Sequence, residues 1–422
     1  MADLQTVSKE APSPSHPYSF ATVFRDPPKA SIRALMPYAM RPGTVSLAGG
    51  YPARELFDVD GLRAANDKVM TRLADYLQYS GVEGQSSLRR EFGKLSAERG
   101  IACDANTEIA VTGGSQQALS LVARVMLQAG DTAIVETAAY TNTIHAIRYT
   151  GATVHTVASR PDGMDLDALE AMLPSVKPKL VCVVASFSNP LGATLTREQR
   201  LRLLALAAQH QFLIVEDDPY GELRFDGTDV PPIMALADAR TRPWAVYLAS
   251  MSKTLSPGMR LGWILADSEI VRRCVSAKSA DDMAAPAWTQ EIAAQYLADG
   301  HYHQHVPRIK AAYGARCQAL ADALTEYLPD DVVFEKPDGG MFLWARLTGP
   351  EDAQALLPYA IEHEVVYVPG HVFYADPKDA DHFAMRMSFA TMSEEKIRLG
   401  ISRLKDALHA CRSKRPCPIV LP

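Results

Sequence analysis

The stretch from Ser250 to Gly262 holds residues that could do covalent chemistry. Lys253 stands between small hydroxyl residues directly after the apolar run Ala245–Ala249, and Arg260 follows seven positions later. Open α/β sheets place their ligands at such strand ends. A lysine amine can form a Schiff base there and an arginine can bind a phosphate bidentately, which are the two contacts that pyridoxal phosphate needs. The alternative is a loop with a solvated lysine and a surface arginine.

An anion site is predicted at a second strand end. Gly113 and Gly114 separate the apolar run Glu108–Thr112 from a helix that starts near Ser115. Glycines let the backbone approach a ligand closely, and the free N–H groups of a helix start attract anions. Ser115 and Gln116 are therefore the candidates for phosphate contact. A tight turn with Ser115 as the N-cap is the alternative.

Three consecutive acids, Glu216 to Asp218, end the apolar run that begins at Phe212. Carboxylates crowded after such a run are costly unless a cation is near. A pyridinium nitrogen is such a cation, and a carboxylate bonded to it keeps it protonated, so that the ring can accept electrons. Asp217 is favoured over Asp218, because Tyr220 can then turn its hydroxyl toward the ring oxygen. A solvated acidic loop is the alternative.

Two further side chains follow predicted strands. Asn189 comes after the run Leu180–Ala185 and could donate its amide to the phenolic oxygen of the ring, or could simply form an Asn-Pro turn. Tyr140 comes after the run Thr132–Glu136, at the head of a helix. Its ring could stack on a flat cofactor or could belong to the core.

One arginine, Arg386, interrupts the otherwise apolar run Met385–Phe389, which contains no acid. A buried arginine needs a carboxylate or a comparable partner. We therefore expect Arg386 to bind the carboxylate of a substrate, with a salt bridge to a neighbouring strand as the alternative.

The elements that must position these side chains alternate along the chain. Short apolar runs are predicted as strands and the longer amphipathic segments between them as helices, which indicates an α/β fold with a mostly parallel sheet covered on both faces. Asp60 is expected to cap a helix that precedes this region. The predicted strands are Glu108–Thr112, Thr132–Glu136, Leu180–Ala185, Phe212–Glu216, Ala245–Ala249 and Leu261–Ala266.

A second, smaller α+β unit is expected after about residue 300. It would comprise a long helix from about His303 to Tyr327, two strands and a closing helix that ends near Cys411. The proline-rich start reads as an extended arm that completes this unit. The predicted organisation is an arm over residues 1–59 that contributes to the small domain and the substrate pocket, a large cofactor-binding domain over 60–300 and a small domain over 301–422.

The composition narrows the class of protein. The chain has 422 residues, a formal net charge of −6 and 47% hydrophobic residues, which suits a large domain with a smaller one. The negative balance gives no reason to expect nucleic acid or an anionic membrane as a partner. No run has the length of a signal-peptide core or a membrane span, so we expect a cytoplasmic protein. Six scattered cysteines without histidines at ligand spacing argue against disulfides and a metal site.

Several independent motifs in one order resemble those of the fold-type-I pyridoxal phosphate-dependent aminotransferases of class I and II. The similarity is strongest to the branch of 2-aminoadipate, kynurenine and aromatic aminotransferases, and to the aminotransferase-like effector domains of some transcription regulators. It runs from about Ser31 to Leu408. The residues that carry it are Gly113–Gln116, Asn189, Asp217, Tyr220, Lys253 and Arg386.

The resemblance implies a role for each matching residue. Lys253 matches the Schiff-base lysine, Asp217 the partner of the pyridine nitrogen, and Arg386 the clamp on the substrate α-carboxylate. Tyr220 and Asn189 match the partners of the phenolic oxygen, and Asn189 also borders the substrate. The stacking aromatic matches Tyr140, and the phosphate contacts match Gly114, Ser115, Gln116, Ser250, Ser252 and Arg260.

The resemblance also implies a partner subunit and a substrate segment. Tyr79 matches a tyrosine that reaches the phosphate of the neighbouring subunit, which implies a homodimer with shared active sites. Gly50 and Tyr51 match a mobile N-terminal segment that contacts substrate, and an arginine at the position of Arg33 can meet a distal carboxylate. Tyr51 stands where a smaller aliphatic residue is usual, so this chain departs from the family at its substrate pocket.

The function that the resemblance implies is transfer of an amino group from an L-amino acid to a 2-oxo acid such as 2-oxoglutarate. The donor would be of the 2-aminoadipate, aromatic or branched-chain type. The alternatives are other reactions of pyridoxal phosphate with amino acids, namely those of a β-lyase, a decarboxylase or a synthase, and a non-catalytic effector domain.

Overall fold

A computed structural model describes residues 18–25, 31–414, 417 and 419, with Ser31 and Arg33 described by their backbone alone. The chain forms two compact units, residues 1–30 and 31–422. The described part of the first unit contains one short 3-10 helix, Thr22–Phe24. The second unit contains the sheets and the predicted site residues.

The largest sheet of the second unit has seven strands in the order β2-β10-β9-β8-β7-β3-β4. All neighbours are parallel except β10, which is antiparallel to both β2 and β9. The expected α/β fold with a mostly parallel sheet is confirmed. The strands are β2 (Ile109–Thr112), β3 (Thr132–Glu136), β4 (Thr153–Val157), β7 (Leu180–Val183), β8 (Leu213–Asp218), β9 (Ala245–Ser250) and β10 (Gly262–Leu265).

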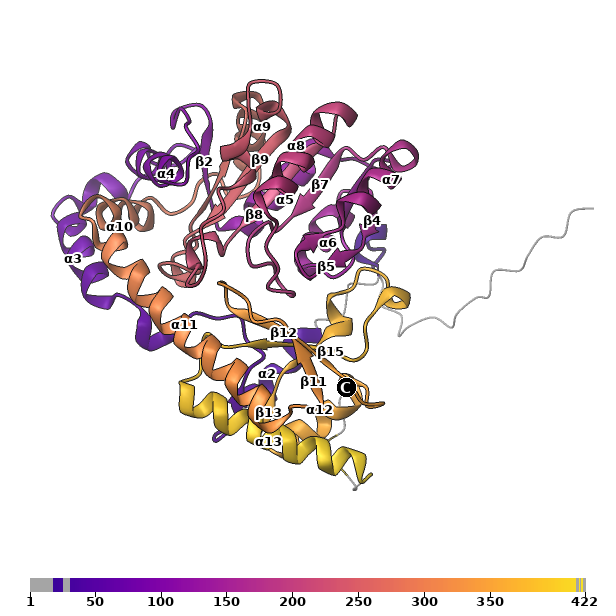
Figure 1. Cartoon of the computed structure of the whole chain (residues 1–422). Helices are drawn as coiled ribbons and strands as arrows, with labels where there is room; N and C mark the ends of the chain where they lie inside the picture. Colours follow the sequence, from indigo (N-terminus) through magenta and orange to yellow (C-terminus); the bar gives the residue numbers. More distant parts are fainter. Residues whose placement is uncertain (1–17, 26–30, 415–416, 418, 420–422) are drawn as a thin grey trace, which may run out of the picture. The chain divides into compact units, whose positions relative to one another are not determined.

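Helices cover both faces of this sheet because successive strand residues point to opposite sides (Figure 1). Ile214 and Tyr247 join one core, whereas Val215 and Val246 join the other. The first core is closed by α3 (Val59–Met70), α4 (Ser86–Glu98), α7 (Leu166–Val176), α8 (Arg197–His210) and α10 (Ala287–Ala298). The second is closed by α5 (Ser115–Met126), α6 (Thr141–Arg148) and α9 (Ser268–Ser279).

A smaller antiparallel sheet lies in the C-terminal part, in the order β11-β12-β15-β14. Strand β1 (Val45–Ser46) pairs in parallel with β13 (Val365–Val366), and buried residues between Leu35 and Ala53 pack with this part of the chain. The domain boundaries at residues 59/60 and 300/301 stay predictions. The elements are β11 (Val332–Phe334), β12 (Phe342–Leu347), β14 (Val368–Pro369), β15 (Ala384–Ser388), α11 (His301–Tyr327), α12 (Ala353–Glu362) and α13 (Glu394–Arg412). Two short helices, α1 (Ser31–Ala34) and α2 (Met36–Ala39), and a hairpin of β5 (Ser159–Arg160) and β6 (Gly163–Met164) complete the unit.

Several expected element ends are wrong by one or two residues; for example, β7 ends at Val183 and not at Ala185, and two further differences concern acidic side chains. Helix α3 is capped by Asp58 and not by Asp60, because the Asp58 carboxylate accepts hydrogen bonds from Gly61 N (3.1 Å) and from the hydroxyl of Tyr296 (2.8 Å). Strand β8 continues two residues past Glu216, because Asp217 and Asp218 remain in register with strand β9. The three acids are therefore the last residues of strand β8 and do not form a solvated loop.

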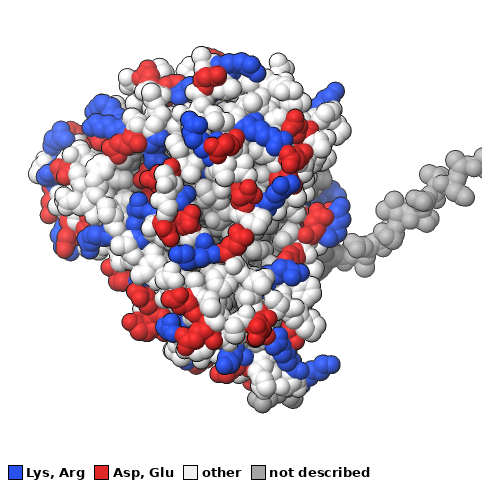
Figure 2. Space-filling model, viewed as in Figure 1, with Lys and Arg blue, Asp and Glu red and all other residues white. Residues whose placement is uncertain are grey.

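Charged side chains of both signs are interspersed over the face shown in Figure 2. No helix among the described residues is long and apolar enough to cross a membrane. The described residues contain no group of three His, Cys, Asp or Glu side chains that could hold a metal ion, and their cysteines are all unbridged.

Candidate active site

Lys253 lies just beyond the end of β9, in the turn that leads to β10. Its Nζ donates a hydrogen bond to the carbonyl of Gly50 at 2.8 Å, a contact between residues 203 positions apart. Burial and the positive charges of Arg386 and Arg260 lower the pKa of the amine to about 8, although the charge of Asp217 opposes this. The amine is thus much closer to its neutral, nucleophilic form at physiological pH than an exposed lysine is.

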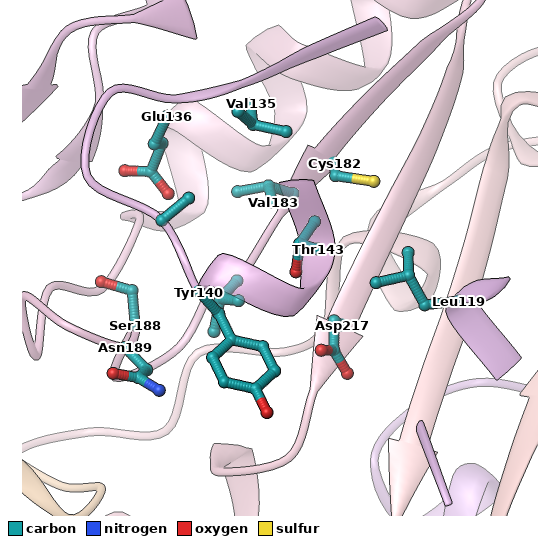
Figure 3. Close-up of a pocket in the computed structure, with 12 residues that line it drawn as sticks. Leu119, Val135, Glu136, Tyr140, Thr143, Cys182, Val183, Ser188, Asn189 and Asp217 are labelled. Atoms are coloured by element: carbon teal, nitrogen blue, oxygen red, sulfur yellow. The ribbon is translucent and has the colours of Figure 1, made fainter. Parts of the chain in front are cut away.

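Asp217, at the end of β8, is buried and lines a small cavity of about 20 Å³ together with Tyr140 and Asn189. In the view of Figure 3 the Tyr140 ring lies between the side chains of Asn189 and Asp217. The Asp217 Oδ1 atom has no hydrogen-bond partner among the described residues. Burial raises the pKa of this carboxyl to about 7, even though a hydrogen bond with Ser115 and the charge of Lys253 lower it. Such a carboxylate would be stabilised by a cationic donor.

Arg386 of β15 reaches the same region from the smaller sheet. Its Nη1 donates to Asn189 Oδ1 at 2.7 Å and its Nη2 to the carbonyl of Ala48 at 2.6 Å, while Nε has no partner among the described residues. Burial lowers the pKa of the guanidinium to about 10. The ion pairs of the described residues include none to Arg386, so the alternative of an inter-strand salt bridge is wrong.

The side chain of Tyr220 is buried beside this arginine. Asn189 forms side-chain hydrogen bonds with both Tyr220 and Arg386, so it links the two. Burial raises the pKa of the Tyr220 hydroxyl, which therefore stays protonated and able to donate at neutral pH.

The predicted anion contacts gather where α5 begins. Arg260 Nη2 donates to the carbonyl of Gly113 at 2.6 Å, and a Cβ atom at Gly114 would lie 2.8 Å from that same nitrogen. Gly114 also has a φ of 97°, so this turn requires glycine for both reasons. Helix α5 starts at Ser115 with Gly114 as its N-cap, which contradicts the alternative in which Ser115 is the cap.

Two hydroxyl residues complete this group. The Oγ of Ser250 accepts a hydrogen bond from Ser252 N at 3.1 Å, which folds the turn ahead of Lys253. The Oε1 atom of Gln116 is buried without a partner among the described residues. Gln116 lies in the first turn of α5, and Ser250 pairs with Gly262, whose backbone packs against Gly114, so both lie near this helix N-terminus.

The three remaining predicted residues are Tyr79, Tyr51 and Arg33, and of these Tyr51 lies near Tyr140 at the edge of the cluster. The side chain of Tyr79 is 80% exposed. Tyr51 is 54% exposed, and its hydroxyl donates to the sulfur of Met36 at 3.8 Å. Arg33 belongs to α1, but its side chain lies outside the described residues.

Several residues of the site gave no signal in the sequence. Ala48 acts through its backbone carbonyl, which every residue has. Gly50 was expected in the substrate segment, but the hydrogen bond that its carbonyl accepts from Lys253 could not be read from the sequence. Phe342 and Phe373 lie with their rings 4.2 and 4.8 Å from the guanidinium carbon of Arg386, yet each looks like an ordinary core residue. Glu136 also lines the cavity beside Asp217, and its position at the end of β3 was the one available hint.

Comparison with known proteins identifies the class. Residues 51–404 match the family of aminotransferases of class I and II. The chain is 37% identical over 405 residues to aromatic-amino-acid aminotransferase 1 of Thermococcus litoralis, covering 94% of this chain and 96% of that protein. It is 35% identical over 380 residues to 2-aminoadipate transaminase of Thermus thermophilus, covering 90% and 94%. The crystal structure of Pyrococcus horikoshii kynurenine aminotransferase in complex with PMP superposes with a TM-score of 0.87 at 34% identity, covering 94% of this chain and 98% of that one.

The chain therefore belongs to the class I and II aminotransferase family. It is a pyridoxal phosphate-dependent enzyme that transfers an amino group between amino acids and 2-oxo acids. The predictions of fold type I, of the cofactor and of amino transfer are confirmed. Amino transfer is thus favoured over the alternatives of a β-lyase, a decarboxylase, a synthase and an effector domain.

The residues of the site fit this cofactor. The unpartnered Asp217 Oδ1 is an acceptor for a protonated ring nitrogen, and the unpartnered Nε of Arg386 is a donor for a carboxylate. Because Gly114 has no side chain, the Arg260 guanidinium can lie directly against the backbone at the start of α5. A guanidinium beside the free N–H groups of a helix start suits a phosphate.

Proposed function

We propose that the cluster around Lys253 is the active site, with the residue roles that the family resemblance assigned. Lys253 is the covalent attachment point, Asp217 the partner of the ring nitrogen and Arg386 the clamp on the substrate α-carboxylate. This proposal rests on three groups that lie in one region. They are the buried Asp217 carboxylate with an unpartnered oxygen, Lys253 with a lowered pKa, and Arg386, which has no carboxylate partner among the described residues. The remaining contacts are Tyr220 and Asn189 on the phenolic oxygen, Tyr140 on the ring face, and Gly114, Ser115, Gln116, Ser250, Ser252 and Arg260 on the phosphate.

When bound, pyridoxal phosphate supplies an electrophilic carbon for amines and a protonated ring that accepts electrons. The chain's own groups do the rest. Lys253, with a pKa of about 8, can take a proton from the substrate Cα and return one, as a general base and then a general acid. Asp217 holds the proton on the ring nitrogen, and Tyr220 donates its hydroxyl toward the phenolic oxygen. Arg386 orients the substrate so that its Cα–H bond faces Lys253.

We further propose that the amino donor is a long dicarboxylic, aromatic or branched-chain L-amino acid and that 2-oxoglutarate is the acceptor. Tyr51 supports an aromatic or branched-chain donor, because its exposed ring offers apolar surface beside Gly50. Arg33 would meet the distal carboxylate of 2-aminoadipate and of 2-oxoglutarate. The names of the relatives, which include an aromatic and a 2-aminoadipate enzyme, support the same range.

A homodimer with shared active sites, in the cytoplasm, completes the proposal. Tyr79 and Leu77, two residues before it, are 80% and 70% exposed in the single chain, as expected of residues that a second copy covers. Arg260 is also exposed, so the phosphate side of the site is open for Tyr79 of the neighbouring subunit to complete.

The test is the visible spectrum of the purified protein during titration with L-glutamate, L-2-aminoadipate, phenylalanine and valine in turn. We expect a cofactor band that bleaches with a true donor and recovers with 2-oxoglutarate. The Lys253→Ala variant should lose the band and all turnover, whereas Lys94→Ala, at an exposed lysine paired with Glu91, should keep both. A Lys253→Ala protein that transaminates at the wild-type rate would refute the assignment.

A further inference from the structure

Arg386 is a buried cation that has no acidic partner in the part of the chain that the structure describes. Two phenylalanine rings lie against it instead: the Phe342 centroid is 4.2 Å and the Phe373 centroid 4.8 Å from the guanidinium carbon. An aromatic face attracts a cation, yet it accepts none of the N–H groups at the edge of the guanidinium. A carboxylate partner would occupy those N–H groups. The rings therefore stabilise the charge without using its N–H groups, and Nε stays without a partner among the described residues while Nη1 and Nη2 donate to Asn189 and Ala48.

Phe342 differs from Phe373 in what else it touches. Its ring meets the Tyr220 ring edge to face, with centroids 5.8 Å apart at 84°. Its Cζ also lies so close to Gly50 that a Cβ atom there would be 2.6 Å away. Gly50 is the residue whose carbonyl accepts the hydrogen bond from Lys253. One ring thus contacts the carboxylate clamp, the tyrosine and the substrate segment.

Phe373 has a narrower environment. Its other aromatic neighbour is Trp344, at 6.2 Å between centroids, and no ring contact joins it to Tyr220 among the described residues. Both phenylalanines are fully buried, so burial alone does not distinguish them. The two phenylalanines can therefore be compared directly. Phe373 contacts Arg386 and not Tyr220, whereas Phe342 contacts both Arg386 and Tyr220.

We propose that Phe342 is a positioning residue that holds Arg386 ready for the substrate carboxylate and ties this clamp to Tyr220 and Gly50, while Phe373 positions Arg386 alone. This proposal rests on the active-site assignment above and deepens it. It differs from simple core packing, because a core residue would affect stability without a selective effect on carboxylate binding or on the cofactor spectrum.

The test compares three variants of the cofactor-loaded enzyme: Phe342→Leu, Phe373→Leu and the control Phe389→Leu. Phe389 is equally buried in the same core, but its ring contact is with Phe225. Calorimetry measures binding of 3-phenylpropanoate or glutarate, whichever binds the wild-type protein more tightly. We expect both clamp variants to bind this carboxylate about 2- to 30-fold more weakly, the range that a lost cation–π contact implies. The control should stay within about twofold of wild type.

The second readout separates the two clamp variants. The pH midpoint of the visible cofactor band depends on the groups around the ring, so Phe342→Leu should shift it through Tyr220, whereas Phe373→Leu should leave it in place. In turnover, both should raise KM for the amino acid more than they lower kcat. The reaction of the bound cofactor with 2-phenylethylamine, which has no carboxylate, should be unchanged in Phe373→Leu.

Three outcomes would overturn the proposal: equal carboxylate affinity in wild type and both clamp variants, an equal loss in Phe389→Leu, or identical pH midpoints in the two clamp variants. If Phe342→Leu does not fold, Phe342→Met takes its place, because the unbranched, flexible methionine side chain fills an irregular gap better than leucine does. Failure of the proposed function is distinct, since it would show as a missing cofactor band or absent transamination in the wild-type protein itself.

Discussion

Asp217 and Asp218 are consecutive residues of β8, and their carboxylates have opposite surroundings. Asp218 is fully partnered within the chain: Arg99 Nη2 lies at 3.1 Å, the Tyr247 hydroxyl donates at 3.0 Å and Gly221 N at 2.8 Å. Asp217 keeps one oxygen without a partner among the described residues and lines a cavity. The difference follows from the alternation of a strand, which turns the two side chains to opposite faces of the sheet.

The comparison separates two uses of a buried carboxylate. A carboxylate that serves the fold has its partners in the chain, so removing it leaves buried cations and donors unsatisfied. A carboxylate that serves a ligand destabilises the ligand-free protein, because its desolvation is not compensated until the ligand binds. Removing it should therefore lower activity and raise the stability of the ligand-free protein. Activity and stability should therefore respond in opposite ways at these two adjacent positions.

The largest effect is expected for Asp217→Asn. An amide cannot hold a proton on the ring nitrogen, so kcat should fall by about 10²- to 10⁴-fold, the range for loss of a positioned proton-handling group. The melting temperature of the cofactor-free protein should not fall. Steady-state kinetics and thermal unfolding of the same preparation check this. A variant with near-wild-type kcat would make Asp218 or another acid the partner of the ring.

The converse change, Asp218→Asn, should act mainly on stability. Among the described residues it leaves Arg99 with the partly exposed Glu222 as its one remaining ion-pair partner. Breaking a buried pair by removing one partner typically costs about 3–5 kcal/mol. Denaturant unfolding should show a loss of this size. The kcat of the folded enzyme should fall far less than for Asp217→Asn, and a loss of equal size would contradict the division between the two faces.

The sequence predicted this division in part. Tyr220, three residues after Asp217, favoured Asp217 over Asp218, and the apolar run before the acids placed them at a strand end. The partners of Asp218 could not be predicted, because Arg99 directly follows α4 and Tyr247 lies on β9, and only the folded chain brings them to β8. The strand order that does so has no local signature in the chain.

The same limit applies to the rest of the site. Lys253, Asn189 and Ser115 could be found because each is a polar residue that follows an apolar run. A polar side chain at the end of a buried strand destabilises the fold unless a partner or a ligand compensates it. Phe342 could not be found in this way, since a phenylalanine in a strand is ordinary core. Its role depends on contacts with Gly50 and Arg386, which are remote in the sequence.

A smaller effect should appear in the pH dependence of the cofactor-free protein. Burial raises the pKa of Asp217 from 3.8 to about 7, so between these values the folded state holds a proton that the unfolded state releases. Stability due to this group is thus complete below pH 4 and is lost as the pH rises through 7. Asp217→Asn removes that loss. Its free energy of unfolding relative to wild type should therefore increase between pH 5 and pH 8, by a few kcal/mol at most.

Urea unfolding at pH 5, 6, 7 and 8 measures this difference. Glu136, whose pKa burial also raises to about 7, titrates in both proteins and cancels in the comparison. Adding the cofactor should flatten the difference, because a ring cation keeps the carboxylate ionised. A difference that is the same at every pH would mean that Asp217 is not strained by its burial.

The smallest effect is expected for Tyr247→Phe, which sharpens the comparison by removing one partner of Asp218 and nothing else. The Tyr247 hydroxyl is fully buried and donates to Asp218 Oδ2, so its loss should cost about 1.5–3 kcal/mol, the value for a hydrogen bond to a charged group. Tyr296→Phe is the matched control, because it removes a buried tyrosine hydroxyl from another aspartate, Asp58, far from β8 in the sequence. Both variants should lose similar stability, and neither should change kcat by more than about twofold. If Tyr247→Phe alone lowers kcat, then the partners of Asp218 also fix the position of Asp217, and the two faces of β8 act as one unit.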